Sequence, residues 1–66
     1  MLERKREELL RRLQLIGAAG HAHPSAKRAL TLLNQTFRKA NVVQRAAVLQ
    51  AADWLIQVIE MSLPLT

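Results

Sequence analysis

The chain has 66 residues, half of them hydrophobic, but only one Phe, one Trp and no Tyr, so it forms at most one small domain with a modest core. The absence of Cys excludes a disulfide framework, a thiolate metal site and a Cys nucleophile, and two Gly and two Pro are too few for a turn-rich β fold. Ten Lys and Arg against five Asp and Glu give a net charge of +5, which suits contacts with phosphate backbones or an acidic protein, or forms no more than a solubilising charged face.

The first predicted element is a helix over residues 2–16. Its large apolar side chains recur at helical spacing and define one buried stripe: Leu2, Leu9, Leu13 and Ile16, widened by Leu10. The Glu7–Arg11 and Glu8–Arg12 pairs are four residues apart, in the order that stabilises a helix. The pattern therefore predicts an amphipathic helix with a charged outer face.

A loop is predicted over residues 17–25, where the helical periodicity stops. Either of its two glycines can close the first helix. Pro24 disfavours helical geometry at the residue before it and suits the first position of a new helix. Ser25 is then the expected N-cap of the second helix, or His23 if Pro24 is itself the first helical residue.

The second helix is predicted over residues 25–39. Its apolar residues alternate four and three positions apart, as in a coiled-coil seam: Ala26, Leu30, Leu33, Phe37 and Ala40. Its other faces carry four basic side chains and no acidic one: Lys27, Arg28, Arg38 and Lys39. This helix is expected to carry much of the positive charge.

A break between the second and third helices is predicted at Asn41. Asn41 precedes Val42, and Gln44 follows three residues after Asn41, which is the arrangement of a capping box at the start of a new helix. The alternative is that Asn41 is a polar residue within one bent helix.

The third helix is predicted over residues 42–61, and it is apolar on nearly every side. Its charged residues Arg45, Asp53 and Glu60 lie close to one face, and Pro64 follows as a stop signal. A helix of this kind is typical of the centre of a bundle. The large side chains of the first two helices are too few to cover it.

We therefore expect an all-α fold in a single domain over residues 1–66. The arrangement is a three-helix bundle or a helical hairpin with an extra N-terminal helix, completed by self-association or by a partner. No uncharged apolar run reaches the roughly 18 residues of a membrane span, and the N-terminus lacks the apolar run of a secretory signal. We expect a cytoplasmic protein with no membrane partner.

The sequence offers little for catalysis or for a cofactor. His21 and His23 are the one candidate metal-binding pair, but zinc sites need three or four protein ligands, and we interpret both residues as solvated loop side chains. There is no Gly-rich phosphate loop, dinucleotide fingerprint or pair of catalytic carboxylates. We expect no enzymatic activity, no metal, no cofactor and no small-molecule substrate.

The wide apolar surface of the third helix indicates a non-enzymatic helical protein-interaction module, such as an adaptor, a regulatory subunit or a co-chaperone. Its partner is a second copy of the chain or another helical protein. The predicted interface consists of one set of third-helix residues: Val48, Ala51, Trp54, Leu55, Val58 and Ile59. Trp54 is the expected anchor, because Trp is enriched at interface hot spots. The alternative is that Trp54 fills the core of a monomeric bundle.

The alternative function is a small DNA- or RNA-binding regulator. Its phosphate contacts, or contacts with an acidic partner, would come from exposed basic side chains of the first two helices: Arg4, Arg11, Lys27, Arg28, Arg38 and Lys39. A helix-turn-helix is weakly supported, because only Gln44 and Arg45 near the start of the third helix can read a base edge. Nucleic-acid binding also requires that the six basic residues share one face.

Overall fold

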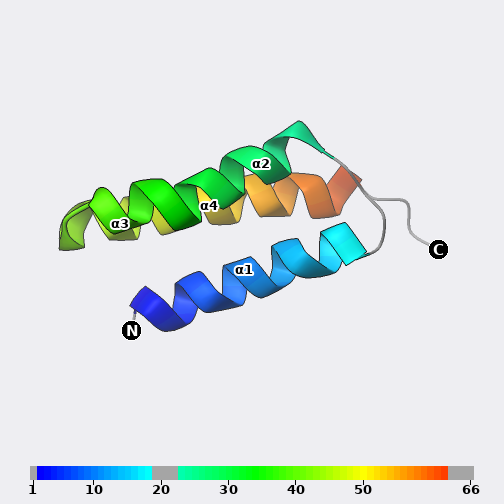
Figure 1. Ribbon diagram of the computed structural model, residues 1–66. Coiled ribbons are helices and arrows are strands. Elements are labelled where there is room, and N and C mark those ends of the chain that lie inside the picture. The colour runs from blue at the N-terminus through cyan, green and yellow to red at the C-terminus, as the bar shows by residue number, and fades with distance from the viewer. Residues whose placement is uncertain (1, 19–22, 63–66) are drawn as a thin grey trace.

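The computed structural model describes residues 2–18 and 23–62, and its regular elements are all helical. Three helical rods form an all-α bundle (Figure 1). The first rod is α1 (Leu2–Ala18), and the last is α4 (Val42–Ser62). The second rod runs without interruption through α2 (Pro24–Thr31), η1 (Leu32–Thr36) and α3 (Phe37–Lys39). The predicted all-α class is confirmed, and each predicted helix is extended by one or two residues.

His23 begins the second rod as its N-cap, with Pro24 in the first helical turn. The Nδ1 atom of His23 accepts a hydrogen bond from the backbone N–H of Ser25 at 3.1 Å. His23 is thus the cap and Ser25 is not, because Pro24 has a φ suited to a helix start and no N–H to leave unpaired. His23 lies just before the helix and is half-buried, so it is a capping residue that stays partly exposed to solvent. His21 lies outside the described residues.

The second rod ends at Lys39, and the chain turns before α4 begins. Ala40 has extended backbone, with φ −83° and ψ 149°. The Asn41 Oδ1 atom accepts from the Gln44 N–H at 2.9 Å, and the Gln44 Oε1 atom accepts from the Asn41 N–H at 3.1 Å. This reciprocal pair is the predicted capping box. The two helices are therefore separate, and the alternative of one bent helix is wrong.

A π-helical turn, η1, lies in the middle of the second rod and was not predicted. The backbone N–H of Phe37 donates to the carbonyl of Leu32, five residues earlier. The neighbouring carbonyl of Leu33 accepts a hydrogen bond from Nε of Arg6 at 2.7 Å, and Nη2 of Arg6 donates to Oδ1 of Asn34 at 3.0 Å. Arg6 thereby ties α1 to the widened turn.

The core lies along the line where the three rods meet. The α4 helix contacts α1 on one side and the second rod on another, so it is central, as predicted. Its remaining face is not covered by either rod. Among the described residues, ten hydrophobic side chains are buried: Leu9, Leu13, Ile16, Ala29, Leu33, Phe37, Leu49, Ala52, Ile56 and Ile59.

Phe37 closes one end of this core, and two arginines cover its ring. The side chain is 2% exposed. The guanidinium carbon of Arg45 lies 4.9 Å from the ring centroid, and that of Arg6 lies 5.6 Å from it. Nε of Arg45 also donates to the Phe37 carbonyl at 3.0 Å. Cations at these distances are attracted by the ring, so Phe37 links all three rods.

Candidate protein-interaction surface

The face of α4 that neither other rod covers carries the only Trp of the chain. Trp54 is 65% exposed, whereas Ile56, two residues further along the same helix, is 0% exposed. Two residues correspond to about 200° of rotation in an α-helix, so Trp54 points away from the core. The alternative in which Trp54 fills the core of the bundle is wrong. Its role as an interface anchor stays a prediction.

Five of the six residues predicted for the interface lie on this side of α4. Ala51 and Trp54 are exposed, and Val48, Leu55 and Val58 are half-buried. Val48 and Leu55 pack against the edge of the core cluster, which fixes the apolar strip to the body of the protein. Together with the exposed Ala47, these residues form what we call the α4 surface: Ala47, Val48, Ala51, Trp54, Leu55 and Val58.

Ile59 does not belong to the α4 surface. It is 0% exposed and lies in the core cluster with Ile56, three residues earlier. A three-residue step returns to nearly the same face of a helix, so the two side chains point inward together. Ile59 has no exposed area to offer a partner, and its inclusion in the predicted interface is wrong.

Two hollows open where α4 meets the second rod. One is lined by the basic pair Lys27 and Arg28 together with Thr31, Leu32 and Leu55. The other lies toward the end of the second rod and is lined by Thr36, Lys39, Ala40, Gln44, Ala47 and Val48. Among the described residues, no acidic side chain lines either hollow. The edge of the α4 surface that faces the second rod is therefore basic.

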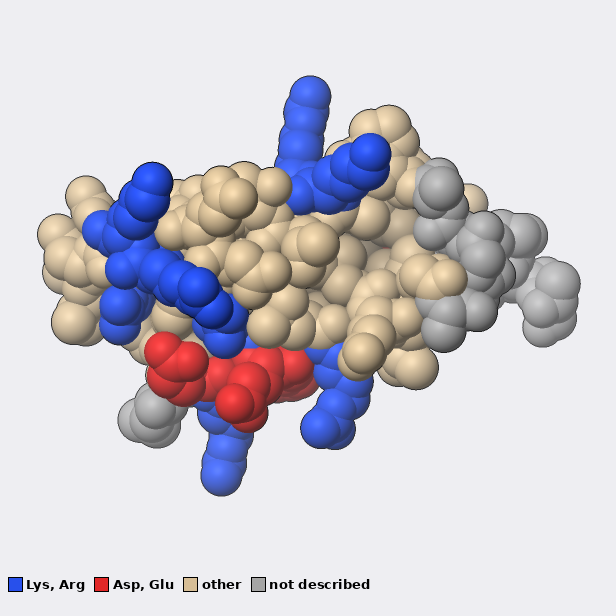
Figure 2. Space-filling model, viewed as in Figure 1, with Lys and Arg blue, Asp and Glu red and all other residues tan. Residues whose placement is uncertain are grey.

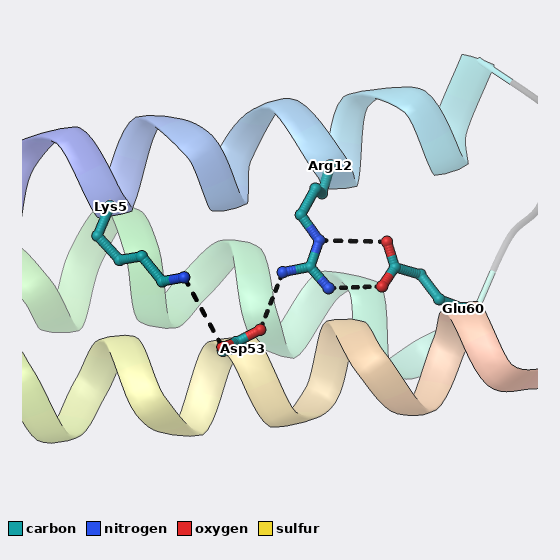
Figure 3. Close-up of polar contacts among 4 residues, drawn as sticks. All are labelled: Lys5, Arg12, Asp53 and Glu60. Carbon is teal, nitrogen blue, oxygen red and sulfur yellow. Dashed lines mark hydrogen bonds and ion pairs between the residues drawn. The ribbon is translucent and has the colours of Figure 1, made fainter.

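The acidic side chains of α4 lie on its opposite side, against α1 (Figure 3). Nη1 of Arg12 donates to Oδ1 of Asp53 at 2.9 Å, and Nε and Nη2 donate to the two carboxylate oxygens of Glu60 at 3.2 and 2.5 Å. Nζ of Lys5 lies 4.0 Å from Oδ2 of Asp53. Arg12, which the sequence pairs with Glu8, reaches across to α4 instead. These carboxylates are neutralised within the chain.

The hydrogen bonds from Arg12 to Glu60 and Asp53 further favour the charged form of a side chain that is protonated at every ordinary pH. Hydrogen bonding to Glu60 is the largest cause that raises the pKa of Arg12 above its already high ordinary value, with Asp53 adding to it and burial opposing it. The guanidinium is therefore positive throughout the pH range in which proteins are studied. It acts as a permanent clamp between α1 and α4.

Arg12→Ala is expected to lower the free energy of unfolding by about 1–2 kcal/mol. The substitution removes three charge-assisted hydrogen bonds, but the side chain is 26% exposed, so water compensates part of the loss. Arg11→Ala is the matched control, because Arg11 is exposed on the same helix, and we expect a change within about 0.5 kcal/mol. Urea unfolding followed by circular dichroism measures both. Equal losses would contradict the clamp.

The six basic residues predicted to contact phosphate or an acidic partner do not form one patch. Four are exposed on the second rod: Lys27, Arg28, Arg38 and Lys39. Arg4 and Arg11 are exposed on α1, where Glu7 and Glu8 lie between them in sequence and are also exposed. Figure 2 shows Lys and Arg side chains projecting from the edge formed by α2 and α3, and acidic side chains gathered along α1. Unbalanced positive charge is therefore concentrated on the second rod.

The described part of the chain offers no metal centre and no membrane span. Within residues 2–18 and 23–62, no group of three His, Asp or Glu side chains is placed to hold a metal ion. In the same ranges, no helix is both long and apolar enough to cross a membrane.

Comparison with known proteins gives no further indication of function. The chain matches no protein-family model, no curated protein and no solved structure. Its function is therefore inferred from the chemistry of its own surface.

Proposed function

We propose that the chain is a small non-enzymatic protein-interaction module that docks through the α4 surface. The observation that carries this proposal is Trp54, 65% exposed in the middle of an apolar strip on a helix whose other side is the core of the bundle. Burying large apolar side chains stabilises a complex by about 1.5–3 kcal/mol each. A partner that covers this strip would gain that free energy without rearranging the bundle.

The shape of the strip also suits a helical partner. Ala47 and Ala51, one helical turn apart, leave the backbone of α4 accessible, while Trp54 and Val58 stand beside them as larger side chains. Small residues at this spacing let a second helix approach closely, and a neighbouring Trp supplies a large contact area with few side-chain rotations to lose. An adaptor, a regulatory subunit or a co-chaperone would each use such a surface.

Trp54→Ala is expected to leave the isolated chain as stable as the parent, within about 0.5 kcal/mol, because an exposed side chain contributes little to folding. Thermal unfolding at low protein concentration measures this. A loss of several kcal/mol would contradict the proposal, since it would place Trp54 in the core.

Photo-crosslinking in the native host tests the docking itself. A benzophenone amino acid replaces Trp54, or, as a matched control, Leu15 of α1, which is 66% exposed. We expect a discrete adduct from position 54 and none from position 15. An adduct of twice the chain mass would identify a second copy as the occupant. No adduct from position 54, or equal adducts from both positions, would contradict the proposal.

Nucleic-acid binding through all six predicted basic residues does not fit, because they do not share one face. A narrower second candidate is binding through the four basic residues of the second rod alone. Four phosphate contacts, one from each of Lys27, Arg28, Arg38 and Lys39, would give a log–log salt slope of about −4 on duplex DNA. A gel-shift titration at several salt concentrations measures the slope. Absence of a shifted band at ~50 mM salt with tens of micromolar protein, on the order of typical non-specific affinities, would remove this candidate.

A further inference from the structure

We propose that the α4 surface takes an acidic amphipathic helix of another protein, an inference that rests on the function proposed above. This inference rests on the apolar strip of α4 lying beside a basic edge that the second rod supplies. Leu32 and Leu55 meet Arg28 in one hollow, and Val48 meets Lys39 in the other. A helix with one apolar face and acidic side chains along its border matches both features.

The positions of Arg28 and Lys39 determine how far apart the acidic side chains of the partner helix must be. Arg28 and Lys39 are eleven residues apart on the second rod, or about 16 Å along a helix axis. A partner helix lying along the strip meets both when its own acidic side chains are about three turns apart. Both hollows are shallow and open to solvent, so a partner helix would lie across them rather than enter them.

A second copy of the chain fits this surface poorly. Its α4 acids, Asp53 and Glu60, are bound by Arg12 on the side that faces α1. In an antiparallel pairing of two α4 surfaces about a two-fold axis, the basic edges of both copies would lie next to each other. The net charge of +5 adds repulsion between copies. An acidic partner neutralises the same edge instead.

Nucleic acid also fits the α4 surface less well than an acidic helix. The strip between the basic residues is apolar, and a phosphate backbone gains nothing from Ala47, Ala51 or Leu55. Stacking of unpaired bases has one aromatic side chain to use, Trp54, among the described residues of this surface. Only a partner with both an apolar face and negative charge uses the whole surface.

The test uses the full chain and two synthetic helical peptides. Each peptide is designed with about 18 residues and contains no aromatic residue. Both carry the same Leu and Ala face; one has two Glu eleven positions apart, and the other has Lys there. Trp54 is the only Trp and there is no Tyr, so intrinsic fluorescence reports on the α4 surface alone. We expect the Glu peptide to shift the Trp54 emission to shorter wavelength and to bind about tenfold more tightly than the Lys peptide.

Charge reversal supplies the decisive comparison. Combining Arg28→Glu with Lys39→Glu should reverse the preference, so that the Lys peptide binds more tightly. The matched control combines Arg4→Glu with Arg11→Glu, an equal charge change on α1, and should keep the preference of the parent. Circular dichroism establishes that both double variants fold.

Each remaining outcome decides between explanations. If both peptides bind the parent equally and Trp54→Ala weakens both, the acidic-helix inference fails while the docking surface stands. If Trp54→Ala leaves the binding of both peptides unchanged, the docking surface itself is wrong. No binding at about 1 mM peptide, a stable dimer in light scattering, or tighter binding to phosphatidylglycerol vesicles than to the Glu peptide would each overturn the acidic-helix inference.

Discussion

Phe37→Ala is expected to remove a large share of the stability of the chain. Phe37 is 2% exposed at the meeting point of the three rods, and truncating a buried Phe costs about 3–5 kcal/mol. The cation–π contacts of Arg6 and Arg45 are lost with the ring, at about 0.5–1 kcal/mol each. A small domain of this size has a total stability on the order of 3–10 kcal/mol, so the substitution removes a large share of it.

Phe37→Leu separates packing from the two cation–π contacts. Leu keeps most of the buried volume but has no ring, so we expect a loss of about 1–2 kcal/mol and a folded protein. Urea unfolding of the parent and both variants, followed by circular dichroism, measures the differences. If the Phe37→Ala variant were as stable as the Phe37→Leu variant, packing of the Phe37 side chain between the three rods would not be what stabilises the core.

Ile59→Ala is expected to lower the free energy of unfolding by about 2–5 kcal/mol. Ile59 is 0% exposed and packs in the core, so the truncation leaves a cavity there. Met61→Ala is the matched control on the same helix, because Met61 is 84% exposed, and we expect a change within about 0.5 kcal/mol. Thermal or urea unfolding compares the two. Equal effects would mean that α4 is rotated from the orientation described.

Comparing Ile59→Ala with Trp54→Ala, both on α4, separates folding from docking. We expect Ile59→Ala to weaken a complex only as far as it unfolds the chain, whereas Trp54→Ala should weaken it without unfolding the chain. Their contrast follows from a rotation of about 140° between residues five apart on one helix.

Sequence patterns predicted the local structure well, because the signals are short-range. The capping box of Asn41 and Gln44 lies within four residues, and the Pro24 signal acts on its immediate neighbour. Helical periodicity likewise needs only one segment at a time. Within the described residues, the number of helical rods and three of their six ends follow from such signals, and the other three ends lie one or two residues beyond the predicted positions.

The orientation of α4 was harder to predict, because apolar residues occur all round that helix. Ile59 and Trp54 look alike in such a pattern, and only the packing of α1 and the second rod decides which one is buried. One usable signal was overlooked. Arg45, Leu49, Ala52, Ile56 and Ile59 repeat at steps of four and three, which marks the inward stripe and places Trp54 outside it.

The cross-helix roles of the arginines depend on tertiary contacts. Arg12 pairs with residues more than 40 positions away, and Arg6 with a carbonyl in a π-helical turn. Neither partner can be read from local spacing. Arg6 does occupy a position within the apolar stripe of α1, between Leu2 and Leu9, and this placement was the one sequence signal of its structural role.

Quenching of Trp54 fluorescence by acrylamide tests the central claim most directly, because no other residue of the chain contributes to the Trp signal. If the α4 surface is open on the folded chain, acrylamide quenches the indole of the dilute, folded protein efficiently, and unfolding in urea increases the quenching only modestly. Quenching decreases only when a partner covers the surface. An indole that is protected in the isolated chain at every dilution, and becomes accessible only when urea unfolds the protein, would contradict the account.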